Sequence, residues 1–470
     1  MMVNLSTMSY SRKIRICAGM LLMFVAAWGE AAPIEGGEPD FSASDLKPDL
    51  PPGESKIDAA LPPEAAQAVA LARAAFQNGK IDECLEHFRV AHASHTSLAP
   101  AKVSLAGLYL ESGQYEPAQR LLEESAVSFP RHPEVFLYFG KLAVAQQRLT
   151  DADLQFRHAL SLPAPANWSL QQRLWLKTHC LMGQTMIAQM RQDWASADRL
   201  LAELVTMHAN DHSLREQWAR ALVERGRTDQ AFEQVDILYR QDHSRQRPEL
   251  AMAVFLFQQG EFETADRWFQ TAETKYPNDA QVYFQRSVSL LSRDRDDQAK
   301  AQATRAAALG LDSIDLHLLR GLIAIYQSDL AAAQQHFTHL REQDPQHAEA
   351  TAYLALALIE QGQQHKRQQA LELAEAAAEQ PSNSPDVSAV WGWVYYRLGQ
   401  EAKAEQILRE VWSQSPNSAT TMFFLARVLQ TQGNVDEARP IAQKLAAAVD
   451  RPGMFVFRPS VKAWLKHVPD

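Results

Sequence analysis

Apolar positions recur along most of the chain at the spacing of amphipathic helices about 12 to 14 residues long. One small residue keeps a fixed step within this pattern, since Ala118 and Ala152 are 34 residues apart. In most copies a larger apolar residue follows four positions later, and glycine often precedes by five. The small positions are Cys84, Ala118, Ala152, Ala197, Ala231, Ala265, Ala299, Ala333, Ala370, Ala404 and Ala438.

This ladder predicts paired helices. Glycine ends the first helix in a tight turn, and the small residue lets the second helix approach the first closely. We therefore predict an all-α fold, a superhelical solenoid of about eleven helix-turn-helix repeats over residues 65–450. The interval before Ala197 has 11 extra residues, which include Trp168. The seventh unit has Asp294 in place of glycine, and we interpret its charged stretch, residues 293–297, as a solvated turn.

One unit carries a more specific signature. Trp391-Gly392-Trp393-Val394-Tyr395 is followed by Gly399, Ala404, Leu408 and Pro416, and here the chain resembles the tetratricopeptide repeat (TPR) family. The resemblance implies stacked helical hairpins whose first helices line an inner surface, and a role in binding other proteins. It does not identify the partner, because one fold hosts many functions.

Apolar residues cluster on the first helices of the sixth, seventh, eighth and tenth units. If exposed, they form a strip that binds an amphipathic helix or an extended apolar peptide. The alternative is that they pack neighbouring helices together. The candidate partner-binding residues are Leu250, Val254, Phe257, Phe284, Val288, Leu291, Leu318, Leu322, Ile325, Tyr326, Trp393 and Tyr396.

Both ends of the chain differ from the repeats. Residues 1–32 have the pattern of a secretory signal peptide, with Arg12, Lys13 and Arg15 before an apolar run over residues 16–28. That run is shorter than the roughly 20 residues of a membrane span, so cleavage is favoured over retention as an anchor. Residues 33–64 predict a disordered linker rich in proline and acidic residues. Residues 451–470 predict a C-terminal capping extension with a helix over 460–467.

Charge and motifs narrow the function. The formal net charge of −10 argues against a nucleic-acid partner, which requires a basic face. The sequence shows no phosphate-binding loop, nucleophile elbow or paired-cysteine metal site, and we expect neither a cofactor nor catalysis. His336 and His339 share one helical face and could hold a metal, but no matching Cys, Asp or Glu completes a site of about four ligands, so no metal is expected either.

These patterns predict a non-catalytic scaffold that binds partner proteins or peptides on its concave face. The signal segment predicts export, with the protein periplasmic or secreted, or anchored to the inner membrane if the segment is retained. Two alternatives stay open. One is an enzyme subunit with its chemistry in the 163–173 insertion or at His336 and His339; the other is a purely structural spacer.

Overall fold

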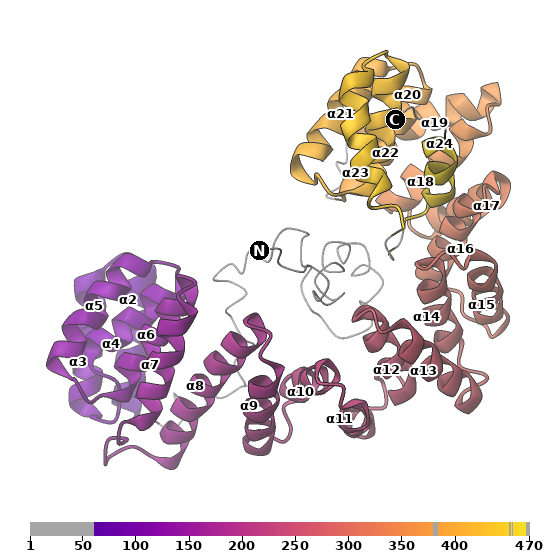
Figure 1. Cartoon of the computed structure of the whole chain (residues 1–470). Helices are drawn as coiled ribbons and strands as arrows, with labels where there is room; N and C mark the ends of the chain where they lie inside the picture. The colour runs from indigo at the N-terminus through magenta and orange to yellow at the C-terminus, as the bar shows by residue number, and fades with distance from the viewer. Residues whose placement is uncertain (1–60, 379–383, 451–452, 454, 467–470) are drawn as a thin grey trace, which may run out of the picture. The chain divides into compact units, whose positions relative to one another are not determined.

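The computed structural model describes residues 61–378, 384–450, 453 and 455–466, which form helices and connecting turns with no strand (Figure 1). The helices are α2 (Pro63–Gln77), α3 (Ile81–Ser94), α4 (Ala101–Glu111), α5 (Tyr115–Ser128), α6 (Pro133–Ala145), α7 (Leu149–Ser161), α8 (Leu170–Met190), α9 (Trp194–Met207), α10 (His212–Glu224), α11 (Thr228–Gln241), α12 (Pro248–Gln258), α13 (Phe262–Lys275), α14 (Ala280–Leu291), α15 (Asp296–Ala308), α16 (Ile314–Tyr326), α17 (Leu330–Gln343), α18 (Ala348–Glu360), α19 (Gln364–Ala378), α20 (Pro385–Arg397), α21 (Glu401–Gln414), α22 (Ala419–Thr431), α23 (Val435–Ala446) and α24 (Arg458–Leu465).

Consecutive helices pair into eleven hairpins, from α2/α3 to α22/α23, and α24 follows the last hairpin. The predicted all-α solenoid of about eleven repeats is confirmed. Contacts divide the chain into two compact units. Among the described residues, the N-terminal unit holds α2–α11 and the C-terminal unit holds α12–α24.

The ladder of small residues lies at the helix–helix contacts, as predicted. All eleven positions fall in the second helix of a hairpin and are at most 5% exposed. The first helix is equally tight where glycine faces the bulky residue of its partner helix. A Cβ added to Gly321 would come within 2.5 Å of the Phe337 ring. The repeat therefore depends on two small positions, one on each helix of the hairpin.

The turn between paired helices has one backbone conformation whether or not glycine is present. Glycines in this turn have positive φ, for example +73° at Gly79 and +81° at Gly260. Four other residues take the same left-handed conformation, which costs roughly 1–2 kcal/mol for a residue with a Cβ. They are Gln147 (φ 58°), Gln192 (59°), Asp294 (61°) and Ser328 (61°).

The insertion before Ala197 is built into the N-terminal unit. Ser169 caps α8 in a capping box with Gln172, which starts a first helix of 21 residues. Trp168 is buried against His132, with ring centroids 5.8 Å apart. The Gln172 side chain donates to the Ser97 carbonyl at 3.0 Å. The insertion thus lengthens a repeat and fastens it to the loop between α3 and α4.

The predicted signal segment, residues 1–32, lies outside the described residues, as do residues 33–60 of the predicted linker. Helix α2 begins at Pro63, so the last residues of the predicted linker already belong to the first hairpin. Among the helices the structure describes, none combines the length and apolar character needed to cross a membrane.

Candidate functional site

The twelve candidate partner-binding residues do not form an exposed strip, and that prediction is wrong. All except Tyr396 are buried, and Tyr396 is partly buried. The seven candidates in α14 and α16 and the two in α20 show why, because they pack in one core cluster with residues of the second helices. The members of that cluster from the predicted strip are Phe284, Val288, Leu291, Leu318, Leu322, Ile325, Tyr326 and Trp393, with Tyr396 packed against it.

The remaining three residues lie in the sixth hairpin and pack there. Leu250 and Val254 belong to a core cluster that also holds Phe269 of the second helix. Phe257 is buried beside Phe262, with ring centroids 5.8 Å apart. For these positions, as for the others, burial supports the packing interpretation that the sequence left open.

The C-terminal extension, residues 451–470, contributes to the same core. Its described residues include Val456, Phe457 and Val461, which are all buried in the large cluster of the C-terminal unit. The Phe457 ring lies 4.9 Å from that of Phe424 in α22 and 6.5 Å from that of Tyr353 in α18. We call the surface formed by α12, α14, α16, α18, α20 and α22 the first-helix face. The extension is seated on this face.

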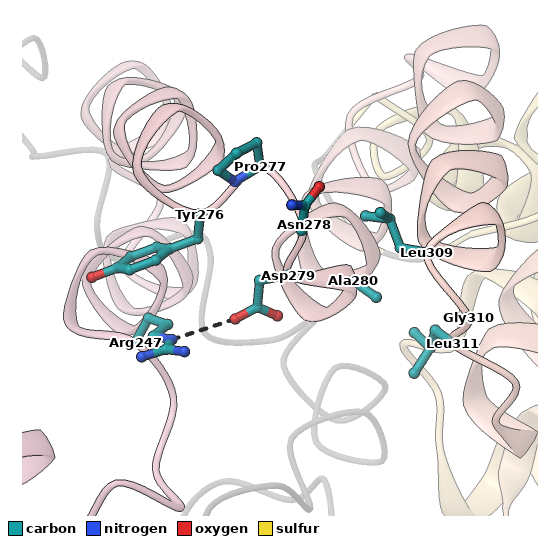
Figure 2. Close-up of a pocket in the computed structure, with 9 residues that line it drawn as sticks. All are labelled: Arg247, Tyr276, Pro277, Asn278, Asp279, Ala280, Leu309, Gly310 and Leu311. Atoms are coloured by element: carbon teal, nitrogen blue, oxygen red, sulfur yellow. Dashed lines mark ion pairs between the residues drawn. The ribbon is translucent and has the colours of Figure 1, made fainter.

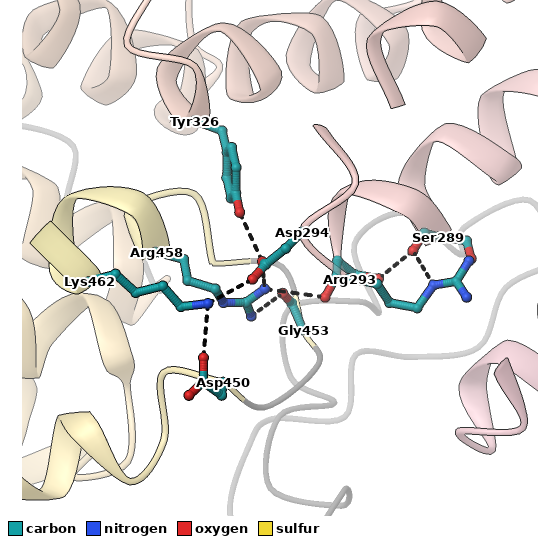
Figure 3. A network of polar contacts seen from close by, with 9 residues as sticks. Ser289, Arg293, Asp294, Tyr326, Asp450, Gly453, Arg458 and Lys462 are labelled. Carbon is teal, nitrogen blue, oxygen red and sulfur yellow. Dashed lines mark hydrogen bonds and ion pairs between the residues drawn. The ribbon is translucent and has the colours of Figure 1, made fainter. Parts of the chain in front are cut away.

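A polar anchor holds the extension at the turn after α14 (Figure 3). Asp294 accepts hydrogen bonds from Arg458, from the Lys462 ammonium at 3.1 Å and from the Tyr326 hydroxyl at 2.9 Å. The Gly453 amide donates to the Ser292 carbonyl at 2.9 Å. The Arg458 side chain is only 4% exposed, and the Asp294 carboxylate helps to offset the cost of burying its charge.

The interpretation of residues 293–297 as a solvated turn is therefore wrong for Arg293, whereas Asp294 is exposed but also held in ion pairs. Besides the contacts of Asp294, the guanidinium of Arg293 is buried and donates to both carboxylate oxygens of Asp266, at 2.8 and 3.0 Å. This bidentate pair joins the turn of the seventh hairpin to α13 of the sixth. Both acidic groups are matched to arginines that the linear pattern does not connect.

The electrostatics of Asp294 follow from these contacts. Burial by itself would raise the pKa of its carboxyl, but the hydrogen bond and charge of Arg458, with those of Tyr326 and Lys462, hold the pKa below its usual value. Asp294 is consequently ionised at neutral pH, the state in which it best accepts from two cations.

The extension was predicted to cap the last repeat through a helix over residues 460–467. Helix α24 covers Arg458–Leu465 and does contact the last hairpin, where the Trp464 indole donates to Gln430 at 2.9 Å. The same segment also reaches α14 and α18. Two features of the sequence are related to this docking. Asp294 departs from the glycine pattern of the turns, and the C-terminal extension carries the basic residues that bind it.

Buried or half-buried carboxyl groups recur at the start of first helices. Burial raises the pKa of Glu134 in α6 to about 8. Burial, with the nearby charges of Asp386 and Asp315, raises that of Glu349 in α18 to about 7. Burial also raises the pKa of Asp386 in α20, which accepts from the Ser418 hydroxyl at 2.9 Å. These groups are costly to ionise in the folded chain.

A surface pocket of about 550 Å³ lies between the turns that precede α14 and α16 (Figure 2). Its charged lining residues are already paired, because Arg247 lies 3.6 Å from Asp279 and its guanidinium lies 5.0 Å from the centre of the Tyr276 ring. The other lining residues are Pro277, Asn278, Ala280, Leu309, Gly310 and Leu311. This lining combines one ion pair with mainly uncharged and apolar residues.

The two histidines of the enzyme alternative lie on one helix, and two further histidines belong to the next hairpin. His336 and His339 lie on α17, His347 caps α18 by accepting from the Ala350 amide at 3.3 Å, and His365 is exposed on α19. Burial lowers the pKa of His336 to about 4. The described cysteines, Cys84 and Cys180, are buried free thiols whose pKa values burial raises to about 11 and about 12. They are therefore poor nucleophiles at neutral pH.

Comparisons with known proteins agree with this architecture. Models of the tetratricopeptide repeat match residues 65–89, 318–364 and 395–452. No curated protein matches the chain. The repeated hairpins show an all-α solenoid, and three of its segments match tetratricopeptide repeats. Proteins built on this fold characteristically act as protein-interaction scaffolds.

Solved structures with detectable similarity are distant. Yeast Tom70 is 14% identical over 86% of this chain and 95% of its own, with a TM-score of 0.36. Cut9–Hcn1, an APC/C hetero-tetramer, is 13% identical over 89% and 98%, with a TM-score of 0.39. A tetratricopeptide repeat protein from Parabacteroides merdae is 12% identical over 54% and 99%, with a TM-score of 0.37. Scores this low do not establish a shared arrangement of whole chains.

Proposed function

We propose that the chain is a non-catalytic scaffold that is exported to the cell envelope and binds a partner protein or peptide on the first-helix face of its C-terminal unit. One observation carries this proposal: a segment of the chain's own C-terminus is already seated on that face. The surface can therefore accommodate a peptide that buries an aromatic ring and places cations on Asp294.

The seated extension suggests the chemistry of the partner. It presents Phe457 to a cluster of aromatic rings, Arg458 to Asp294, and Lys462 to the same carboxylate. A partner segment that has an aromatic residue followed by a cation would make equivalent contacts. Aromatic residues and arginine are the side chains that most often dominate binding energy at interfaces.

The alternatives receive less support. The insertion over 163–173 contributes Trp168 to a core and Gln172 to a loop contact, both of which are packing roles. A pure spacer does not require a charged tail that returns to a hairpin 164 residues earlier. Nucleic acid is a poor partner for a chain with a net charge of −10.

A peptide-binding measurement tests the binding surface. A labelled peptide of residues 453–466 is titrated against three full-length proteins: the wild type, Arg458→Ala, and Arg458→Ala with Asp294→Asn. We expect the peptide to bind Arg458→Ala, because its own extension is released while Asp294 remains. Binding should be at least about tenfold weaker to the wild type, whose face is occupied, and to the double variant, which lacks the carboxylate.

The control peptide carries alanine at 457 and 458 and should not bind. Failure of the native peptide to bind Arg458→Ala, with helicity unchanged, would rule out this face as a peptide site. Export needs a separate test. Cells expressing the full chain should release it with the envelope fraction, whereas a chain without residues 1–32 should stay in the cytoplasm. Equal distribution of the two would contradict the export proposal.

A further inference from the structure

Three potential metal ligands meet beside the eighth hairpin, although they are scattered in the sequence. Asp312 lies in the loop before α16, His317 in the first turn of α16, and His339 in the last turns of α17. One ligand atom from each of these residues lies within 4.8 Å of the others. The sequence pattern had paired His339 with His336 and found no matching Cys, Asp or Glu to complete a site.

The local structure explains how these side chains converge. Ser313 caps α16 by accepting from the Leu316 amide at 3.2 Å, which fixes Asp312 just before the helix and His317 just inside it. Helix α17 runs back along α16, so that the His339 ring lies 4.3 Å from the His317 ring, centre to centre. Asp312 is 2.7 Å from Nε2 of His317. Short, well-defined backbone elements therefore hold all three residues.

One polar atom in the cluster is left without a partner. Nδ1 of His317 is buried and has no hydrogen-bond partner among the described residues. That atom points away from Nε2, the ring nitrogen that faces Asp312, so Nε2 is the atom of His317 that an ion shared with Asp312 would take. The His317 side chain is largely buried, whereas that of Asp312 is open to solvent, so an ion can reach the cluster from outside.

We propose that Asp312, His317 and His339 form a zinc site that joins the two ends of the eighth hairpin. Two imidazole nitrogens and a carboxylate oxygen are the donors that Zn²⁺ commonly takes. In a tetrahedral zinc site, ligand atoms about 2.0–2.2 Å from the metal lie roughly 3.3–3.5 Å from one another. Side-chain rotations that move the ligand atoms by about an ångström convert the observed cluster into that arrangement.

The fourth position falls to Glu342, whose carboxylate lies 4.0 Å from Nδ1 of His339. Its side chain is exposed and free to turn toward the metal, and water occupies the position otherwise. The metal would bridge the loop before α16 to the end of α17.

Zinc binding to the full-length, tag-free protein tests this site. We expect one Zn²⁺ per chain by equilibrium dialysis with elemental analysis, and a rise in thermal midpoint with added zinc. His317→Ala with His339→Ala should remove the bound zinc. Asp312→Asn changes an exposed side chain and should weaken binding on the order of tenfold or more while leaving helicity unchanged.

The matched control is His365→Ala, which removes an exposed histidine from the next hairpin and should leave the zinc stoichiometry unchanged. Cobalt is the second probe, because tetrahedral Co²⁺ gives visible absorption bands that should vanish in the double variant. A wild-type chain that binds no zinc overturns the proposal. So does zinc that persists in the double variant, or that is lost equally in the His365→Ala control.

Discussion

The sixth and seventh hairpins each have the same type of turn between their two helices, but the turn residue has a different role in each. Gly260 makes the turn between α12 and α13 with φ at +81°, and Asp294 makes the equivalent turn between α14 and α15 with φ at +61°. Glycine serves the turn alone. Asp294 bears the cost of the left-handed backbone and in addition receives Arg458 and Lys462 of the extension. The contrast shows that a departure from a repeat pattern can mark a contact specific to one copy.

Of the changes that test this comparison, removing the charge at Asp294 should have the largest effect. Asp294→Asn keeps the size and tolerates the left-handed turn, but it removes the negative charge that faces the buried guanidinium of Arg458. We expect the docking of the extension to weaken by about 2–4 kcal/mol, less than for a fully buried pair because 34% of the Asp294 side chain is exposed. Hydrogen exchange across residues 455–466 should accelerate accordingly.

The control for that experiment is Asp297→Asn, two positions inside α15 and outside the contacts with the extension. It should leave exchange in the extension unchanged. Unchanged protection in Asp294→Asn would show that apolar packing alone holds the extension.

The two hairpins should respond alike where they share the ladder position. Ala265→Phe in α13 and Ala299→Phe in α15 each insert a ring into a closed helix pair and should cost about 1–3 kcal/mol of unfolding free energy. Chemical denaturation measures the loss. Thr271→Phe, at an exposed position of α13, should change stability little. A wedge that is harmless at Ala265 but not at Ala299 would mean that the hairpins are packed differently.

Two equivalent positions in other hairpins should differ in how they make folding stability depend on pH. Glu64 in α2 is exposed, whereas burial raises the pKa of Glu134 in α6 to about 8. Between the unfolded pKa near 4.3 and the folded value, the native chain binds more protons than the unfolded chain at Glu134, so stability falls as pH rises. Glu134→Gln should therefore gain about 1–2 kcal/mol over the wild type at pH 8 and little at pH 5.

Unfolding free energies measured across that pH range provide the test. Glu64→Gln should run parallel to the wild type throughout. If Glu134→Gln also runs parallel, the Glu134 carboxyl is better solvated than its burial implies.

The smallest effect is expected at Gln147, which makes the same turn in the third hairpin with an exposed side chain. Gln147→Gly should relieve the left-handed strain and stabilise the chain by about 0.5–1 kcal/mol, after allowing for the greater freedom of glycine in the unfolded state. The denaturation midpoint should rise, while Gln147→Ala should not raise it. Lower stability with glycine would mean that Gln147 has a role of its own.

The sequence predicted what repeats from copy to copy. The spacing of Ala118 and Ala152 predicted the hairpins, and the glycines before them predicted the turns. It failed for the apolar residues of the first helices, because periodicity does not distinguish an exposed strip from positions that pack against neighbouring helices. Phe457 and Phe284 belong to one core although 173 positions (457 − 284) separate them.

Long-range convergence was also hidden for charged side chains. Asp294 was recognised as irregular, but nothing local in the sequence connects it with Arg458. The meeting of Asp312 and His317 with His339 likewise depends on helix pairing. Predicting such contacts requires the rotation of each helix about its axis, which the repeat spacing constrains only near the ladder.

The return of the extension to the seventh hairpin changes how the C-terminal unit should come apart. A stack in which each repeat contacts only its neighbours loses structure from its ends, one repeat at a time. Bonds between Asp294 and Arg458 link positions 164 residues apart and close that stretch into a loop. While these bonds hold, the last repeats cannot unfold one at a time. We expect the seventh to eleventh hairpins to unfold together as one cooperative block.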